Sequence, residues 1–237
     1  MFERPHHARV AEVLAALDGP FLLANGCLFG GGTAMALRYG EYRESVDIDF
    51  LVSDIDGYRV LRQRLTGKEG LANIARKGAS LNQLREVRAD QYGIRTAVGV
   101  DGVAIKFEIV LEARIELASP GPDDMQCGVA TLSPLDMATS KLLANSDRWA
   151  DDAVFSRDLI DLAMMQPGAK LLKQAREKAM VAYGESIDTD LARAIGKLLT
   201  REGRLERCMQ MMQMTVPPAL LRQRIKRLLP KVGPVRT

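Results

Sequence analysis

The chain has 237 residues, of which 47% are hydrophobic and 27% are charged, the composition of a globular protein with a substantial core. The length fits one large domain or two modest ones. Composition excludes a disordered chain, a collagen-like repeat and a disulfide scaffold, and no apolar run approaches the roughly 18 residues of a membrane span. Because the N-terminal segment lacks a secretory apolar stretch, we expect a cytoplasmic protein that does not bind a membrane.

Cysteine and histidine are too scarce to build the commoner catalytic centres. The three cysteines, Cys27, Cys127 and Cys208, are far apart and form no CxxC pair, which argues against a zinc site. The two histidines, His6 and His7, are neighbours near the N-terminus. We therefore expect the chemistry to depend on carboxylates, Lys, Arg, Ser or Thr, and backbone amides.

Charge is distributed unevenly along the chain. After position 200, nine Lys or Arg residues stand against two Glu, which gives this part a charge of +7. Because the whole chain carries +3, the first 200 residues carry −4. An acidic body with a basic end suggests that one end of the molecule meets a polyanion.

The first half of the chain alternates short helices with strands. Apolar spacing predicts helices over 8–17, 33–39 and 58–65, the second with Thr33 as its N-cap and Gly40 as its C-cap. Alternation predicts a strand over 46–52 and a hairpin of strands 94–100 and 103–111, because Asp101-Gly102 between two apolar runs is a strong hairpin signal.

The second half is predicted to be helical. Ser133 and Pro134 begin a helix that extends to about 144, and further helices are expected over 151–165, 169–183, 188–200, 205–214 and 218–229. The loop 119–124, rich in Pro, Gly and Asp, is the predicted boundary between an α/β domain at 1–124 and a helical domain at 125–237. The expected fold class is therefore α+β.

A run of three glycines precedes the predicted helix at 33–39. Gly31, Gly32 and Thr33 would let the backbone approach phosphate groups closely, with unpaired N–H groups and the helix dipole behind them. A tight turn without a ligand is the alternative. The Rossmann fingerprint fails because its third glycine would fall at Met35, and no GK[ST] follows for a P-loop.

Three acidic residues form the candidate metal site. Asp47 and Asp49 are two apart on a predicted strand, so both carboxylates point to one side. Like charges held this close favour a bound cation, and Mg²⁺ prefers such oxygen ligands. Glu108 on a later strand would complete a two-metal clamp on nucleotide phosphates; a solvent-facing glutamate is the alternative.

The segment GGTAMALRYGEYRESVDIDF, residues 31–50, resembles the AbiEii/AbiGii-type toxin nucleotidyltransferases of the DNA-polymerase-β-like superfamily. A second segment, SKLLANSDRWADDAVFSRDLIDLA, residues 140–163, resembles the family's second block, in which a lysine on one helix precedes R-D-x-x-D-L on the next. The resemblance implies a nucleotidyltransferase-type mixed β-sheet domain followed by an α-helical domain. Beyond about residue 170 we recognise no motif.

The resemblance implies transfer of NMP from an NTP to a hydroxyl, with RNA and in particular the tRNA 3′ end as the expected acceptor. Asp47, Asp49 and Glu108 would bind Mg²⁺, and Asp47, Asp49, Glu108 and Lys141 would be catalytic. The nucleotide would be bound by Gly31, Gly32, Thr33, Arg43, Ser45, Lys141, Asp158 and Asp161. The third acid is Glu where many superfamily members carry Asp.

Several of these residues have structural alternatives. Ser45 could serve as a turn residue and Arg43 could be a solvated cation. Asp158 and Asp161 share one helical face, and an Arg157–Asp161 ion pair at i,i+4 would be an ordinary helix contact. The resemblance favours a role for the two aspartates in aligning Lys141 or the nucleotide.

The C-terminal region has two further features. Arg222, Arg224, Lys226 and Arg227 lie in a predicted cationic helix that either binds RNA phosphates or is simply solvated. Met209, Met211, Met212 and Met214 form an apolar stripe that is either core or a partner-binding face.

The leading hypothesis is the toxin of a toxin–antitoxin or phage-defence system, with a cognate antitoxin as partner. Two alternatives are a catalytically silent module that binds RNA or a partner on the same fold, and an enzyme that transfers NMP to Ser, Thr or Tyr of a protein.

Overall fold

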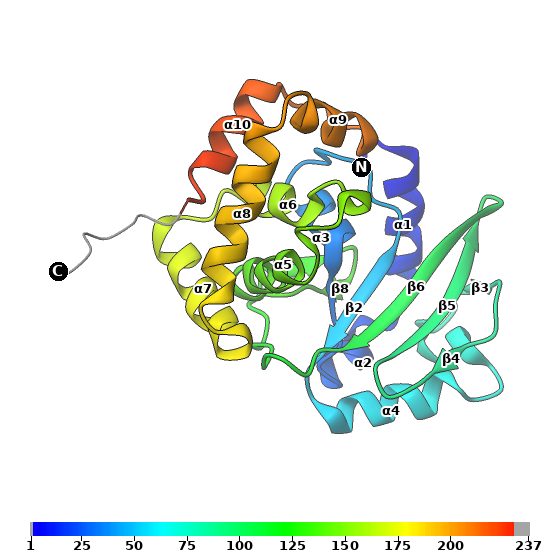
Figure 1. Cartoon of the computed structure of the whole chain (residues 1–237). Helices are drawn as coiled ribbons and strands as arrows, with labels where there is room; N and C mark the ends of the chain where they lie inside the picture. Colours follow the sequence, from blue (N-terminus) through cyan, green and yellow to red (C-terminus); the bar gives the residue numbers. More distant parts are fainter. Residues whose placement is uncertain (1, 230–237) are drawn as a thin grey trace. The chain divides into compact units, whose positions relative to one another are not determined.

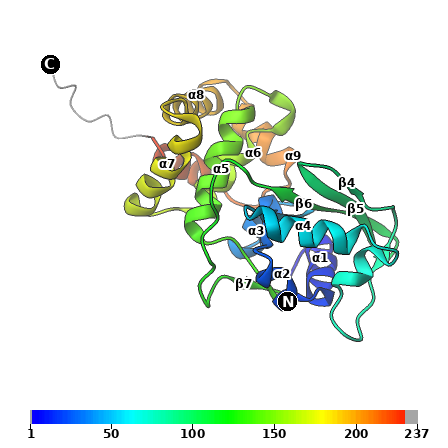
Figure 2. The same ribbon diagram turned by 90° about the horizontal axis from the view of Figure 1, so that it is seen from below.

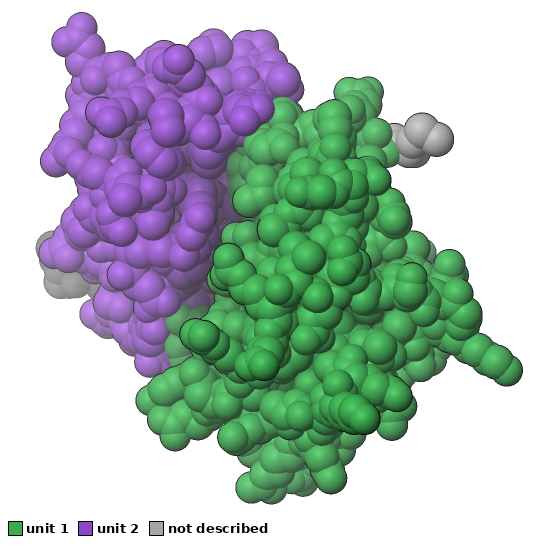
Figure 3. All heavy atoms as spheres, turned by 90° about the vertical axis from the view of Figure 1, so that its right-hand side faces the viewer, with its two compact units in different colours: residues 1–137 green, residues 138–237 purple. Residues whose placement is uncertain are grey.

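The computed structural model describes residues 2–229 and separates the chain into two units, residues 1–137 and 138–237 (Figure 3). The division falls inside helix α5 (Pro134–Arg148), later in the chain than the loop 119–124. The segment after that loop belongs to unit 1 because it pairs back onto an early strand: Thr131 forms a β-bridge with Phe29, and the Leu132 N–H donates to the Phe29 carbonyl at 3.0 Å.

Unit 1 is built around a mixed β-sheet, which confirms the expected α+β class (Figure 1). The strand order is β1-β2-β6-β5-β3, with β4 also paired to β5. β2 is parallel to β6 and antiparallel to β1. The strands are β1 (Leu28–Gly30), β2 (Ile48–Val52), β3 (Asn82–Gln83), β4 (Arg88–Ala89), β5 (Gly93–Val100) and β6 (Val103–Leu111).

The predicted hairpin is confirmed as β5 and β6. Asp101 and Gly102 both adopt positive φ, 48° and 75°, as a two-residue hairpin turn of this type requires. Alternation along the strands then sends apolar side chains to one face. Phe29, Phe50 and Phe107 stack across three strands, with ring centroids 5.5 and 5.6 Å apart, and all three are buried.

The helices of unit 1 begin earlier than the sequence predicted. They are α1 (Pro5–Ala16), α2 (Gly19–Ala24), α3 (Gly31–Arg38), α4 (Ile55–Leu65) and the 3₁₀ helix η1 (Gly70–Ile74), followed by the small hairpin β7 (Met125–Gln126) and β8 (Val129–Ala130). Thr33 was expected as an N-cap, and this is wrong because α3 already begins at Gly31. The strand predicted over 46–52 begins at Ile48, so Asp47 directly precedes it.

The described part of unit 2, residues 138–229, is built from helices without strands. It contains the rest of α5, the 3₁₀ helix η2 (Asp152–Val154), α6 (Arg157–Met165), α7 (Ala169–Tyr183), α8 (Ser186–Thr200), α9 (Arg204–Met211) and α10 (Pro218–Lys226). α7 and α8 pack side by side (Figure 2), and α6 packs against α8 and α10. None of the described helices combines the length and apolar character that a bilayer crossing requires.

The continuous helix predicted over 151–165 is wrong. Phe155 and Ser156 take left-handed φ values of 51° and 53°, a conformation that ends one helical turn before the next begins. The chain therefore forms η2, a bend, and then α6. This bend places Asp158 in the first turn of α6, where the helix dipole favours a negative charge.

The methionine stripe is mainly core, since Met209 and Met212 are buried, although Met211 is exposed. The buried face of α10 is formed by Leu221 and Ile225. The last two basic residues counted in the C-terminal region, Lys231 and Arg236, lie outside the described residues.

Candidate active site

The glycine turn at the start of α3 lies directly against a carboxylate of β2. Gly31 has a φ of +67°, and a Cβ placed on it would stand 2.6 Å from Oδ2 of Asp49. No larger residue could occupy this position without moving the carboxylate. The first N–H groups of a helix have no partner within that helix, so the turn brings the amides of a helix N-terminus next to an acidic side chain.

The loop before β2 closes over the second glycine. A Cβ on Gly32 would stand 2.4 Å from Nη2 of Arg43 and 3.3 Å from Oγ of Ser45. Thr33 is buried, and its hydroxyl donates to Oγ of Ser45 at 2.9 Å. Arg43 is buried rather than solvated and donates from Nη1 to the Glu44 carbonyl at 2.8 Å. Thr33 therefore orients Ser45, and a guanidinium lies over the turn.

The sheet register sets acidic and basic side chains in one row. Asp49 is the direct partner of Glu108 on the parallel neighbour β6, and Glu108 is the direct partner of Arg95 on β5. Partners in register on adjacent strands, about 4.8 Å apart, project to the same face. The structure therefore brings Asp49 and Glu108 to one face of the sheet. Asp47 directly precedes β2, and its place beside them stays a prediction.

Two cations hold the carboxylate of Glu108. Arg95 Nε lies 2.6 Å from Oε1 and Lys106 Nζ lies 2.5 Å from Oε2. Burial alone would raise the pKa of Glu108, but hydrogen bonds and charge from Lys106 and Arg95 outweigh it and hold the pKa below the ordinary value. The pKa of Lys106 is raised although burial opposes this, because Glu108, Asp49 and Asp47 all favour its charged form.

Asp47, Asp49 and Glu108 are carboxylates of the kind that bind divalent metals, but cationic side chains of the protein already lie beside them. Among residues 2–229, no three His, Cys, Asp or Glu side chains are grouped closely enough to hold a metal ion as they stand. Asp47 and Asp49 supply the hard oxygens that Mg²⁺ prefers. Lys106, a cation, already lies in the field of these two carboxylates. The residues therefore fit a cation at this place, and the part of Glu108 as third acid stays a prediction.

A feature missed by the sequence analysis is the attachment of the loop 41–46, which precedes β2, to residues at the N-terminus of α1. The Glu41 carboxylate accepts hydrogen bonds from the backbone N–H groups of Glu3 and Arg4 at 2.8 and 3.1 Å. Buried His7 contacts Glu41 through Nδ1 at 2.8 Å and accepts the Ser45 N–H at Nε2 at 3.2 Å. Because Nε2 is the acceptor, the ring proton is on Nδ1 and the imidazole is neutral.

Further contacts continue this attachment along the loop. Arg4 pairs with Glu44 at 3.0 Å, and His6 contacts the Val46 carbonyl at 2.9 Å. We call residues 3–7 the N-terminal strap. The strap fixes the loop 41–46, which carries Arg43 and Ser45. No short-range signal could have found this arrangement, since its partners are far apart in the sequence.

In unit 2 the second sequence block forms a closed cluster of charges. Lys141 of α5 lies 3.2 Å from Oδ1 of Asp158 and 2.6 Å from Oδ2 of Asp161, both on α6. Arg148 grips Asp158 with Nε at 2.6 Å and Nη2 at 2.9 Å. Lys141, Asp158 and Asp161 are all buried. Two cations thus meet two carboxylates, and the predicted alignment of Lys141 by both aspartates agrees with this geometry.

The two cations of this cluster lower the pKa of Asp158. Burial acts to raise it and Asp161 adds to that, but Lys141 and Arg148 hold the pKa of Asp158 below its ordinary value. The alternative ion pair between Arg157 and Asp161 is not what the cluster shows: Arg157 is exposed, whereas Asp161 is fully buried against Lys141.

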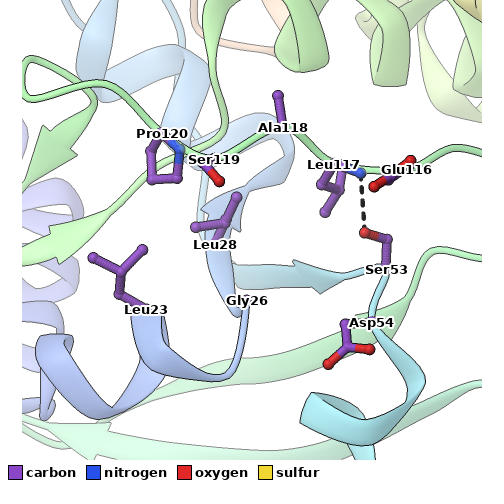
Figure 4. A pocket seen from close by; sticks show the side chains of 10 residues that line it. All are labelled: Leu23, Gly26, Leu28, Ser53, Asp54, Glu116, Leu117, Ala118, Ser119 and Pro120. Carbon is purple, nitrogen blue, oxygen red and sulfur yellow. Dashed lines mark hydrogen bonds between the residues drawn. The ribbon is translucent and has the colours of Figure 1, made fainter.

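A pocket of about 560 Å³ in unit 1 lies away from these residues (Figure 4). Its wall combines apolar side chains such as Leu23 and Leu28 with Ser53 and Asp54, which directly follow β2. The hydroxyl oxygen of Ser53 accepts the Leu117 N–H at 2.9 Å. None of the predicted site residues lines this pocket.

Two of the four cationic side chains of helix α10 and its end, Arg222 and Arg224, contact other residues of the protein. Arg222 donates to the Leu199 carbonyl at 3.2 Å and lies 3.7 Å from Glu206, and Arg224 points its Nη1 at the sulfur of Met164. Lys226 and Arg227 are exposed. The part of this helix left to meet a polyanion is therefore smaller than its sequence indicates.

Comparison with known proteins identifies one family. A family model described as "Nucleotidyl transferase AbiEii toxin, Type IV TA system" matches residues 13–234. No curated protein matches the chain. A crystal structure described as a candidate nucleotidyltransferase from H. pylori is 15% identical, with a TM-score of 0.49 over 94% of this chain and 92% of that one. The crystal structure of JHP933 from Helicobacter pylori is 13% identical, with a TM-score of 0.44 over 96% of each chain.

The family match spans nearly the whole described chain, and it defines the protein as a nucleotidyltransferase. More narrowly, the chain belongs to the AbiEii toxin family of type IV toxin–antitoxin systems. Membership implies an NTP substrate and an antitoxin partner. The resemblance drawn from residues 31–50 and 140–163 is thereby confirmed.

Proposed function

We propose that this nucleotidyltransferase transfers NMP from an NTP to the 3′-hydroxyl of an RNA, with tRNA as the acceptor. The observation that carries the proposal is the approach of Gly31 to Asp49, because a Cβ at residue 31 would stand 2.6 Å from the carboxylate. Amides that bind phosphate and a carboxylate that binds a cation are then adjacent, as phosphoryl transfer requires.

Each part of unit 1 has a role in this proposal. The N-terminus of α3 binds triphosphate oxygens through its backbone amides, and Arg43 over Gly32 neutralises their charge. Asp47 and Asp49 would hold Mg²⁺, with Glu108, which Arg95 and Lys106 orient, as the predicted third acid. When bound, Mg²⁺ supplies activation of the acceptor hydroxyl and charge stabilisation on the leaving pyrophosphate.

The second block has a structural role within unit 2. Asp158 and Asp161 fix Lys141 and thereby join α5 to α6. Contact of Lys141, Asp158 and Asp161 with the nucleotide stays a prediction from the family resemblance.

The test uses the full chain with each of the four α-³²P-labelled NTPs, Mg²⁺ and total RNA. We expect label in RNA with at least one NTP, lost when the RNA is first treated with periodate, which destroys the 3′-terminal diol. Asp49→Ala should reduce transfer at least about 10²-fold, since metal ligation contributes several kcal/mol. Asp123→Ala, an exposed aspartate in the loop 119–124, is the matched control.

Other outcomes distinguish the alternatives. Label that resists ribonuclease but is lost with protease would show a protein acceptor. An absence of transfer with every NTP, together with RNA binding that is indifferent to Mg²⁺ and to Asp47→Asn, would show a silent binding module.

A further inference from the structure

The acidic row consists of Asp47, Asp49 and Glu108. Arg95 and Lys106 both hold Glu108 and both are open to solvent, with 41% and 51% of their side chains exposed, but Lys106 is held at this one carboxylate. It lies two residues before Glu108 on β6, so both side chains project from the same face of the strand. Its Nζ is 2.5 Å from Oε2 of Glu108, yet 51% of its side chain is exposed, against 13% for Glu108. The ammonium is therefore reached by solvent while the carboxylate it binds is largely covered.

The second cation at Glu108 is held differently. Arg95 spans two carboxylates, with Nε at 2.6 Å from Glu108 and Nη1 at 3.0 Å from Asp90. A planar guanidinium fixed at two points is pre-organised, whereas an ammonium on a flexible four-carbon stem is not. If Lys106 left, Arg95 would still orient Glu108.

Charge balance explains why Lys106 occupies this place. Asp47, Asp49 and Glu108 each favour its charged form, and acidic groups on one sheet face repel one another unless a cation lies among them. A divalent ion would satisfy the same carboxylates with twice the charge. Lys106 and such an ion therefore compete for one set of oxygens.

We propose that Lys106 is a displaceable internal cation: it neutralises the acidic row of the ligand-free protein, and moves to a triphosphate oxygen when Mg²⁺–NTP binds. This inference rests on the proposed function, because it presupposes that Asp47 and Asp49 hold the metal. It goes beyond that function by making Lys106 a positioning residue that couples metal binding to nucleotide binding.

Two consequences follow for binding. Without nucleotide, metal must displace Lys106 at the cost of an ion pair, so the free protein binds metal weakly. With a triphosphate present, the released ammonium has a new partner, so each ligand strengthens the binding of the other, as linkage requires. Lys106 would therefore neutralise the metal-binding carboxylates whenever neither metal nor nucleotide is bound.

The experiment measures Mn²⁺ binding to the full chain by electron paramagnetic resonance without nucleotide. Lys106→Met should bind Mn²⁺ at least about tenfold more tightly than the wild type. The variant lacks a positive charge a few ångströms from the metal site, and even in water the repulsion between such a charge and Mn²⁺ is large enough to change the affinity by about this factor. Lys106→Arg, which keeps the charge, should bind as weakly as the wild type. Lys77→Met removes an exposed lysine elsewhere and controls for net charge.

A calorimetric titration with Mg²⁺–inorganic triphosphate tests the second half of the proposal. Triphosphate carries no base, so the identity of the NTP does not enter. The affinity for Mg²⁺–triphosphate, divided by the affinity for Mg²⁺ alone, should be at least about tenfold smaller in Lys106→Met than in the wild type, because one ammonium–phosphate contact is lost. Circular dichroism confirms folding, and Lys106→Gln replaces Lys106→Met if that variant does not fold.

Equal Mn²⁺ affinity in the wild type and Lys106→Met would overturn the inference. So would a gain in Mn²⁺ binding that survives Asp49→Asn in the Lys106→Met background, because the added ion would then lie elsewhere. Failure of the proposed function is a separate result: no label transfer to RNA, with the Lys106 and Asp49 effects on Mn²⁺ binding still present.

Discussion

The two units each contain a lysine surrounded by carboxylates, but the two clusters differ in their access to solvent. In unit 2, 7% of the Lys141 side chain is exposed and none of Asp161 is. In unit 1, 51% of Lys106 is exposed beside Glu108. Both arrangements pair the same chemical groups at similar distances. Their difference is whether water and ligands can reach the cation.

This difference in exposure decides how much each cluster contributes to the stability of its unit. In unit 2, Lys141 and Arg148 face Asp158 and Asp161, so every charge is met within the cluster. Breaking such a buried set leaves an uncompensated charge, which is costly. In unit 1 the exposed ammonium is exchangeable at little cost, because half-exposed ion pairs contribute little to stability. The same pairing of lysine with carboxylate thus contributes much to the free energy of unfolding in unit 2 and little in unit 1.

The largest expected effect comes from making the same substitution in both clusters. Lys141→Met should lower the free energy of unfolding by roughly 3–5 kcal/mol, because two buried carboxylates lose their shared cation. Lys106→Met should lower it by no more than about 1 kcal/mol. Urea unfolding followed by the fluorescence of Trp149, the single tryptophan of the chain and part of unit 2, measures the first change; circular dichroism measures both.

Similar losses for Lys141→Met and Lys106→Met would contradict the comparison. A variant that restores charge, Lys141→Arg, should recover part of the lost stability and thereby show that charge, rather than side-chain volume, is responsible.

A smaller effect on stability with a large effect on activity is expected at the glycine turn. Gly31→Ala and Gly26→Ala place alanine at φ values of +67° and +63°, and each should cost roughly 1–2 kcal/mol. Only at residue 31 does the new Cβ meet Asp49; around Gly26 nothing lies within 4 Å. Gly31→Ala should therefore also reduce NMP transfer at least about 10²-fold, since displacing a reacting group by about 1 Å has that effect.

The pair of glycine variants separates strain from displacement of the carboxylate. Transfer assays and urea midpoints on both variants supply the measurement. If Gly26→Ala lost as much activity as Gly31→Ala, the approach of the turn to Asp49 would not be the cause.

The smallest expected effect is the pH dependence of the N-terminal strap. The pKa of His7 lies below 6.5, because burial disfavours the charged ring more than Glu41 and Glu44 favour it. Below about pH 6.5 the unfolded chain takes up a proton that the folded protein resists, so stability falls with falling pH, by at most about 1.4 kcal/mol per pH unit. Below about 4.5, protonation of Glu41, whose folded pKa is also lowered, removes more.

Urea unfolding at pH 7.5, 6.5, 5.5, 4.5 and about 3.5 measures this dependence. In His7→Gln, which cannot titrate, the loss between pH 6.5 and 5.5 should shrink, while the loss below 4.5 from Glu41 persists. An unchanged pH profile in His7→Gln would show that the imidazole does not contribute.

Local signals in the sequence predicted much of unit 1. Asp101-Gly102 was sufficient to place the hairpin, because its positive φ values are a property of the two residues themselves. In unit 2, the spacing of Asp158 and Asp161 put both on one helix face, and both contact Lys141. These features depend only on neighbours along the chain. The shared side of Asp47 and Asp49 stays a prediction, because β2 begins at Ile48.

Features that depend on distant residues were not predictable. The break at Phe155 and Ser156 carries no glycine or proline, so nothing in the sequence marks it. Lys106 and Glu108 are two residues apart on one strand, but Glu108 stands beside Asp49 only because β2 and β6 are neighbours in register. The role of His7 in the strap was not predictable, since its partners Glu41 and Ser45 lie beyond the range of any local pattern.

The parallel pairing of β2 with β6 has a consequence for the cell that makes this protein. Asp49 on β2 and Glu108 on β6 are partners in register, although α4, η1, β3, β4 and β5 lie between these two strands in the sequence. Long-range parallel pairing is slow to form, because the loop must close before its contacts are gained. A chain still emerging from the ribosome therefore cannot bring Asp49 beside Glu108 until β6 has been made and paired with β2.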